Sequence, residues 1–125
     1  MMTKLESLIA DLTAAIKRLK EAARLKPTPI SRDATIQRFE FCFELAWKTI
    51  QAYVRDQGLE GKSPKSCLRI AVELGLIANL EDWFGYLEAR NLIAHTYNED
   101  LADKVYNTAV KFPVEIDKLL KNIKQ

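Results

Sequence analysis

Hydrophobic residues recur along this chain every three or four positions, which is the spacing of one face of an α-helix. The first such stretch covers residues 3–25 and ends at a Lys-Pro-Thr-Pro segment. A second helix is expected to be capped by Ser31 or Asp33 and to end at Gly58, since glycine accepts the left-handed backbone of a helix terminus. The apolar face of the first helix holds Leu5, Leu8, Ile9, Leu12, Ala15, Ile16 and Leu19, and that of the second holds Ile36, Phe39, Phe43, Ala46, Trp47, Ile50 and Val54.

The second half of the chain predicts three more helices. A Ser-Pro pair at 63–64 is typical of a helix start, and the short helix that follows is expected to end near Gly75. A fourth helix covers about 80–95, and a fifth, capped by Asn98, continues to about residue 123. Pro113 is expected to kink or break the fifth helix, because proline lacks the backbone donor. The residues expected near one side of the fourth helix are Trp83, Phe84, Leu87, Asn91 and Ala94.

Together these elements predict an all-α fold. No stretch alternates apolar and polar residues with the two-residue period of a strand. Because the connections between long helices are short, consecutive helices should be antiparallel, which gives an up-and-down bundle of four main helices plus a short one. We expect one helical domain over residues 1–125. A bundle this small usually leaves an apolar strip exposed for a partner, which favours a homodimer or a heteromer.

Composition narrows the kinds of protein that this chain can be. With 48% hydrophobic residues the chain can bury a core, yet it has neither a run of about 18 apolar residues nor an apolar segment near its start. We therefore expect a cytoplasmic protein without membrane association. Cys42 and Cys67 lie inside predicted helices and lack a Cys-x-x-Cys spacing, so they are expected to be buried thiols. Neither a metal nor another cofactor is expected.

Charge is unevenly distributed, although a net charge of +2 is too small to indicate a nucleic-acid-binding protein. Residues 17–38 are mostly basic, whereas residues 73–103 hold seven acids and a single base, Arg90. Both stretches are compatible with ordinary solvated helix faces. If RNA binds near Arg90, the basic residues of the 62–69 segment, of 17–38 or of a second subunit must offset the local repulsion.

One polar segment carries the clearest sign of chemistry. Arg90, His95 and Tyr97 lie within eight residues, and His95 is the only histidine of the chain. A guanidinium binds phosphate oxygens, an imidazole transfers protons near neutral pH, and a phenol donates a hydrogen bond or acts as a nucleophile. Asn91, about one turn before His95, shares its helix face. The sequence therefore predicts a phosphate-directed site made of these four residues.

Helix geometry limits how these side chains meet. Five residues rotate by about 500°, so Arg90 and His95 point about 140° apart on a regular helix. They converge if the arginine curls toward the helix end, or if two copies of the motif meet across a dimer axis. Three structural alternatives stay open: His95 as a cap of backbone carbonyls at the helix C-terminus, Arg90 as the ion-pair partner of a nearby acid, and Tyr97 as a core or interface aromatic.

The order of several segments resembles a known family. Ribonuclease-type members of the HEPN superfamily carry an Arg, four to six residues, a His, one residue and a Tyr, and Arg90, His95 and Tyr97 fit that motif. Nearly the whole chain is similar to the branch called nucleotidyltransferase substrate-binding proteins. The segments that carry this resemblance are 38–41, 43–49, 63–65, 73–77 and 90–98.

The resemblance implies a helical homodimer in complex with a minimal nucleotidyltransferase encoded beside it. In HepT-like toxins the dimer is a metal-independent RNase, which implies that His95 acts as acid or base, Arg90 stabilises phosphate charge and Asn91 orients the imidazole. The partner is then an antitoxin that adds AMP to Tyr97, a residue that otherwise positions the phosphate. The alternative is a non-catalytic adaptor that binds a nucleotide or other substrate for the partner enzyme.

Overall fold

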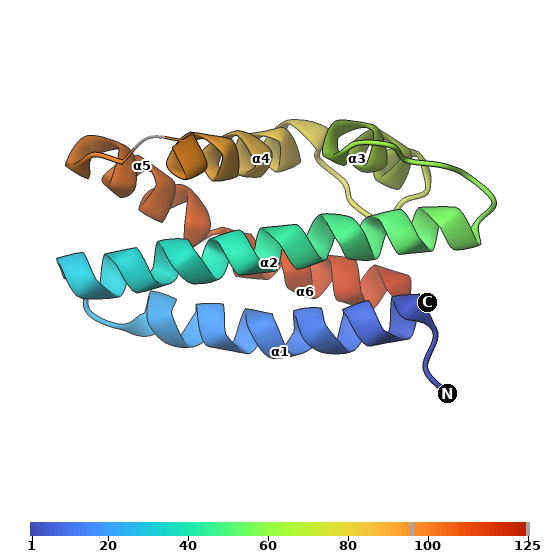
Figure 1. Ribbon diagram of the computed structural model, residues 1–125, viewed down its shortest axis with the longest axis horizontal. Helices are drawn as coiled ribbons and strands as arrows, with labels where there is room; N and C mark the ends of the chain where they lie inside the picture. The colour runs from blue at the N-terminus through green and yellow to red at the C-terminus, as the bar shows by residue number, and fades with distance from the viewer. Residues whose placement is uncertain (96, 125) are drawn as a thin grey trace.

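A computed structural model describes residues 1–95 and 97–124 of this chain, and within these residues every regular element is an α-helix (Figure 1). The prediction of an all-α fold is confirmed, with the fifth predicted helix divided into two. Although the first two helices are long, none in the described part of the chain has the length and apolar composition needed to cross a membrane. The helices are α1 Lys4–Arg24, α2 Pro29–Asp56, α3 Pro64–Glu73, α4 Leu80–His95, α5 Glu99–Ala109 and α6 Phe112–Ile123.

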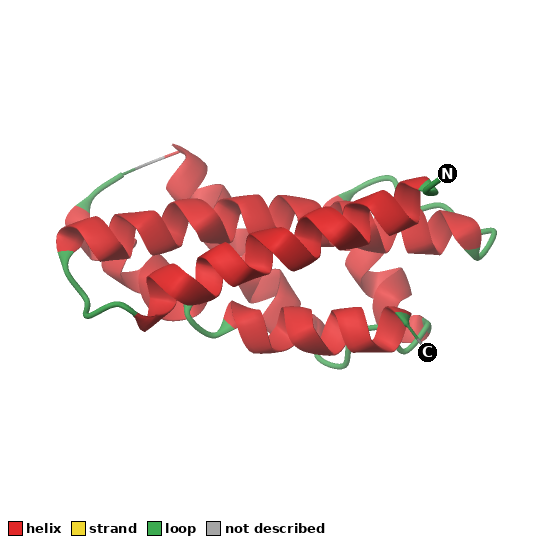
Figure 2. Cartoon of the chain, turned by 90° about the horizontal axis from the view of Figure 1, so that it is seen from below, coloured by secondary structure: helices red, strands yellow, loops and turns green. Residues whose placement is uncertain are grey.

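Helix α2 is the centre of the bundle and contacts each of the other five helices. Helix α1 runs antiparallel along one side of α2, while α3, α4 and α5 lie along the opposite side (Figure 1). Helix α6 packs against α1, α2 and α5, and both views place the start of α1 and the end of α6 at the same end of the bundle (Figure 2). This arrangement sets the junction of α4 and α5 beside the first turns of α2.

Five aromatic rings from three helices form the centre of the core. Phe112 of α6 contacts Phe39 and Phe43 of α2, with ring centroids 5.2 and 5.9 Å away. The same ring contacts Trp83 and Tyr86 of α4, at 5.3 and 4.7 Å. Burial raises the pKa of the Tyr86 phenol to about 12, so Tyr86 is a packing residue rather than an acid or base at neutral pH.

The buried face of α4 differs in part from the predicted one. Trp83 and Leu87 are buried as expected, and Ala89 is buried as well. In contrast, Asn91 and Ala94 are exposed, because the core ends before the last turn of the helix. The polar side chains of this last turn are therefore accessible.

The start of α2 differs from the prediction. Its N-cap is Thr28, whose hydroxyl accepts a hydrogen bond from the Ser31 backbone N–H at 3.1 Å, while the Ser31 hydroxyl accepts one from the Thr28 N–H at 2.8 Å. Ser31 or Asp33 as the cap is therefore wrong, because Pro29 has the φ of a first helical residue and starts the helix earlier. The cap of α3 is Ser63, as predicted.

Helix ends follow the predicted glycine and proline positions. Gly58 and Gly75 lie just beyond α2 and α3 with φ angles of 81° and 75°, which only glycine adopts without strain. Asn98 caps α5 by accepting a hydrogen bond from the Leu101 N–H at 2.8 Å. Pro113 stands in the first turn of α6, where its missing N–H costs no helical hydrogen bond, so the predicted break is confirmed.

Cys42 and Cys67 are free thiols buried in the core, as predicted. Burial raises the pKa of the Cys42 thiol to about 12 and that of Cys67 above its ordinary value. Both are therefore protonated at neutral pH and act as small apolar side chains.

Gly61 and Gly85 should respond in opposite directions to alanine. Gly61 is buried, and a Cβ atom added there would collide with the Sγ atom of Cys67, so Gly61→Ala is expected to lower the free energy of unfolding by about 1–3 kcal/mol. Gly85 is exposed on α4 with no atom within 4 Å of an added Cβ. Gly85→Ala is expected to raise the free energy of unfolding by about 0.5–1 kcal/mol. Urea unfolding measures both changes, and a stabilised Gly61→Ala variant would contradict the packing described.

Candidate functional site

The predicted site residues lie at the C-terminal end of α4, and each has different neighbours. Helix α4 ends at His95, so Tyr97 lies beyond it, in the connection to α5. Among the described residues, no hydrogen bond or ion pair joins any two of Arg90, His95 and Tyr97. In a single chain the three side chains therefore contact separate sets of residues.

His95 and Asn91 line one surface pocket, in agreement with their spacing on the helix. The pocket has a volume of about 520 Å³ and extends along α4 from Phe84 to His95, with Lys65 of α3 in its wall. This volume is within the usual range of small-molecule sites, and its wall combines apolar side chains with a few polar ones. The lining residues are Lys65, Phe84, Leu87, Glu88, Asn91, Leu92 and His95.

Two basic side chains of α3 face the aromatic ring of this pocket. The Nζ atom of Lys65 lies 5.8 Å from the centroid of the Phe84 ring, and the Cζ atom of Arg69 lies 5.4 Å from it. The fold thus brings basic residues of the 62–69 segment beside the first half of α4, and Lys65 lines the same pocket as His95. An anion that enters the pocket meets positive charge there, which offsets the repulsion from Glu88.

Arg90 is directed toward α2. Its Nη1 atom donates a hydrogen bond to the Glu44 carboxylate at 2.8 Å, and its guanidinium lies 5.5 Å from the centroid of the Phe43 ring. The alternative of an ion pair with an acid is therefore confirmed, although the acid comes from α2 rather than from residues 73–103. The Nε atom of Arg90 is buried without a hydrogen-bond partner, so this guanidinium keeps an unused donor.

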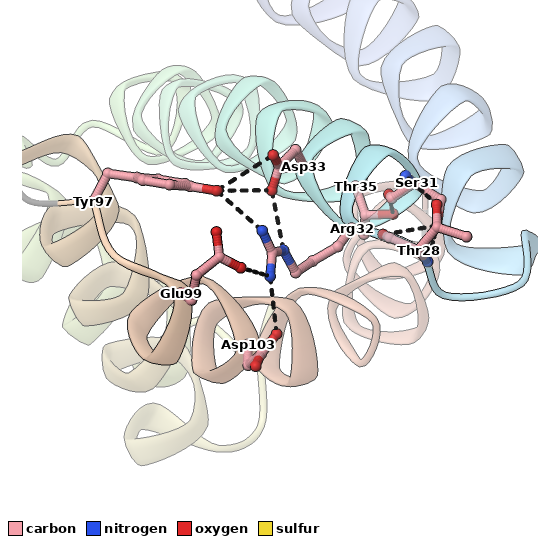
Figure 3. A network of polar contacts seen from close by, with 8 residues as sticks. All are labelled: Thr28, Ser31, Arg32, Asp33, Thr35, Tyr97, Glu99 and Asp103. Carbon is pink, nitrogen blue, oxygen red and sulfur yellow. Dashed lines mark hydrogen bonds and ion pairs between the residues drawn. The ribbon is translucent and has the colours of Figure 1, made fainter.

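The Tyr97 hydroxyl contacts two neighbouring side chains from the start of α2 (Figure 3). It accepts a hydrogen bond from the Nη2 atom of Arg32 at 3.0 Å. Both carboxylate oxygens of Asp33, whose Oδ1 atom also accepts a hydrogen bond from the Arg32 Nε atom at 3.0 Å, lie 3.3 Å from the hydroxyl and accept its proton. The phenol therefore contacts a cation and an anion at once.

Arg32 itself is fixed by acids of α5 (Figure 3). Its Nη1 atom donates to Glu99 at 2.7 Å and to Asp103 at 3.2 Å, and its side chain is only 9% exposed. The hydrogen bond to Glu99 is the main cause that raises the pKa of Arg32 above its ordinary value, and Asp33 and Asp103 add to it. The basic stretch 17–38 and the acidic stretch 73–103 therefore meet at this arginine.

The sequence did not identify Arg32 and Asp33 as partners of Tyr97. The hydrogen bond from Arg32 joins residues 65 positions apart, and helical periodicity gives no information about such a pair. The only signal in the sequence was the opposite charge of the stretches 17–38 and 73–103. Asp33 was considered as a helix cap, a role that Thr28 takes instead.

A helical bundle with an Arg-x4-His-x-Tyr motif at a helix end resembles a domain of HEPN type. The chain belongs to the family described as nucleotidyltransferase substrate binding protein like, whose model matches residues 6–125. The resemblance drawn from the sequence segments is thereby confirmed. A probable ribonuclease HepT from Haemophilus influenzae is 32% identical over 95 residues, which are 72% of this chain and 65% of that relative's length.

Solved structures share the fold over almost the whole chain. A crystal structure of a protein from Thermus thermophilus has a TM-score of 0.85 and 40% identity, and the match covers 91% of this chain and 99% of that one. A Haemophilus influenzae protein, described as having the fold of a substrate binding domain of a nucleotidyltransferase, has a TM-score of 0.79 and 26% identity, over 94% of this chain and 99% of that one.

A more distant structure is that of a tri-AMPylated HEPN toxin from Shewanella oneidensis in complex with the MNT antitoxin. Its TM-score is 0.78, and the match covers 98% of each chain. At 19% identity this likeness concerns the fold.

Proposed function

We propose that this protein is the nucleotide- or RNA-binding subunit of a two-component system with a minimal nucleotidyltransferase, and that it uses the pocket of His95 as its phosphate site. The observation that carries this proposal is the composition of the pocket. Lys65 supplies a charge for a phosphate, Asn91 and His95 supply hydrogen bonds, and the Phe84 ring supplies a surface on which a base stacks. The family description and the toxin–antitoxin complex of the Shewanella relative support the partner.

The reaction that we propose for this site is metal-independent RNA cleavage by transesterification. The ribose 2′-hydroxyl attacks the adjacent phosphate, His95 takes up or returns a proton, and Arg90 stabilises the charge on the non-bridging oxygens. Within one chain Arg90 contacts Glu44 rather than His95, so the proposal brings the two groups together across the axis of a homodimer, where Arg90 must exchange its Glu44 contact for the phosphate. The probable ribonuclease with 32% identity supports this reaction.

The second candidate is a non-catalytic adaptor that binds a nucleotide and presents it to the partner's active site. The separate surroundings of Arg90, His95 and Tyr97 in one chain favour it, because a binding pocket needs only His95, Asn91 and the neighbouring cation. The family description also agrees with it.

Lys65 should contribute more to ligand binding than Lys62, which is exposed and does not line the pocket. Lys65→Ala is expected to weaken the binding of ATP or of a short RNA about tenfold, since it removes a charged phosphate contact. Lys62→Ala removes the same charge nearby and should leave affinity close to wild type. Isothermal titration at one fixed salt concentration measures both values. Equal losses in the two variants would mean that only the overall charge matters, and would contradict the pocket as the site.

The partnership itself is tested with the nucleotidyltransferase encoded beside this protein. The two purified proteins are mixed at micromolar concentration and are expected to elute together in size-exclusion chromatography. Separate elution would contradict the two-component proposal. Nucleotide binding by the pair but by neither protein alone favours the adaptor, whereas cleavage of RNA in the presence of EDTA by this protein alone favours the RNase.

A further inference from the structure

The contacts of the Tyr97 hydroxyl are those of an activated nucleophile. Asp33 accepts its proton and Arg32 donates to its oxygen, while the Nε atom of Arg32 also donates to Asp33 at 3.0 Å, so the phenol contacts a carboxylate and a guanidinium that are themselves paired (Figure 3). A carboxylate so placed takes the proton when the oxygen forms a new bond, while a guanidinium stabilises the negative charge that develops on the oxygen.

Accessibility differs among the three residues in a way that suits this role. The Tyr97 side chain is 57% exposed, so a large reactant can approach its hydroxyl. Asp33 is half-exposed, whereas Arg32 is 9% exposed and is held from behind by Glu99 and Asp103. The oxygen and the proton acceptor therefore face solvent, and the cation has a fixed position.

We propose that Asp33 and Arg32 activate Tyr97 as the acceptor of a nucleotidyl group, with Asp33 as the general base and Arg32 as the stabiliser of the phenolate oxygen. The inference rests on the proposed partnership with a nucleotidyltransferase and adds to it a chemical role for the acceptor chain. The phenol oxygen forms a bond to the α-phosphorus of ATP bound to the partner, and the bond from that phosphorus to the β-phosphate oxygen breaks. Pyrophosphate leaves, and the phenolic proton passes to the Asp33 carboxylate.

The same arginine also has a role after the transfer. The new phosphodiester carries its negative charge on the two non-bridging oxygens of the phosphate bonded to the Tyr97 oxygen, within reach of the Arg32 guanidinium. An arginine is better suited than a lysine to both steps, because its planar group can bind the oxygen while it keeps its hydrogen bonds to the acids of α5.

The test measures the transfer of AMP to this protein in the complex with its partner, with ATP and Mg²⁺, by intact-protein mass spectrometry over time. Asp33→Asn keeps the size of the side chain but removes the base, and it is expected to lower the maximal rate on the order of 10²-fold. Arg32→Lys should also lower it. The matched control is Asp100→Asn, which removes one exposed carboxylate from the first turn of α5 and should leave the rate unchanged.

A second comparison separates the chemical role from a structural one. Asp103→Asn removes a carboxylate from the same guanidinium without changing the contacts of the Tyr97 hydroxyl, so its loss should be much smaller than that of Asp33→Asn. Partner affinity and thermal midpoint are measured for every variant. The expected result for Asp33→Asn is a lower maximal rate with affinity and midpoint close to wild type.

Three outcomes would overturn the inference. Equal rates for Asp33→Asn and Asp100→Asn would overturn it and leave the partnership intact. If the lower transfer rate of Asp33→Asn is explained by weaker partner binding or by unfolding, the contact between Asp33 and Tyr97 has only a structural role. Absence of AMP on wild-type Tyr97 in a complex that forms and binds ATP would overturn both the inference and the proposed modification.

Discussion

Replacing His95 with alanine is expected to lower the rate of RNA cleavage by about 10²- to 10⁴-fold, because the variant lacks the only imidazole available for proton transfer. The rate is measured on a labelled single-stranded RNA with EDTA present, which suppresses contaminating metal-dependent nucleases. The side chain is exposed, so the substitution should leave the thermal midpoint nearly unchanged. Activity lost without a loss of stability would then report chemistry rather than folding.

Cleavage that persists in His95→Ala at the wild-type rate would contradict the RNase proposal. It would identify the activity as a contaminant and favour the adaptor. Lys62→Ala, prepared in the same way, is the control for purification, since Lys62 is exposed and outside the pocket.

A mixing experiment tests whether the site is shared between two copies. Arg90→Ala and His95→Ala are each expected to be inactive alone. If Arg90 of one chain serves His95 of the other, a mixed dimer of the two variants contains one intact site, and activity partly returns after the dimers exchange subunits. No recovery in a verified mixed dimer would contradict a site composed across the dimer axis.

Phe112→Ala is expected to lower the free energy of unfolding by about 3–5 kcal/mol. Phe112 is fully buried, and its ring contacts four other aromatic rings from α2 and α4. Its removal leaves a cavity at the point where α2, α4 and α6 meet, and small domains have only about 5–15 kcal/mol of stability in total. Urea unfolding followed by circular dichroism gives the change in midpoint and slope.

The matched control is Phe41→Ala. Phe41 is on α2, two residues from Phe39, but its side chain is 58% exposed. The same change in chemistry should therefore alter the free energy of unfolding by less than about 0.5 kcal/mol. Similar losses in both variants would contradict the aromatic cluster as the centre of the core.

Local features of the sequence predicted the helices well. Each of the useful signals reflects interactions within one helical turn or at a helix end, which depend on neighbours in the chain. These signals were the three- and four-residue spacing of apolar residues, Gly58, Gly75 and Pro113. The same reasoning failed at the start of α2, where three nearby polar residues compete for one cap. The reciprocal hydrogen bonds of Thr28 and Ser31, together with Pro29, decide that competition.

The candidate site was predicted less completely. Spacing correctly grouped Asn91 with His95, because both lie on one helix. Spacing gave no indication that Arg90 pairs with Glu44, 46 positions earlier in the chain. It also gave no indication that Tyr97 pairs with Arg32. Such pairs form only after α2 has packed beside the junction of α4 and α5.

The sequence by itself determined the helical class, most helix boundaries, the family and the set of polar residues at the end of α4. Periodicity, helix caps and helix breakers depend on a few neighbouring residues. The order of the segments that resemble the family can also be read directly from the sequence. Only the tertiary structure decided which surroundings each polar side chain has: Lys65 lines the pocket of His95, Glu44 binds Arg90, and Arg32 and Asp33 contact the Tyr97 hydroxyl. The physical reason is that these contacts join different helices, and their distances are set by the packing of a shared core rather than by spacing along the chain.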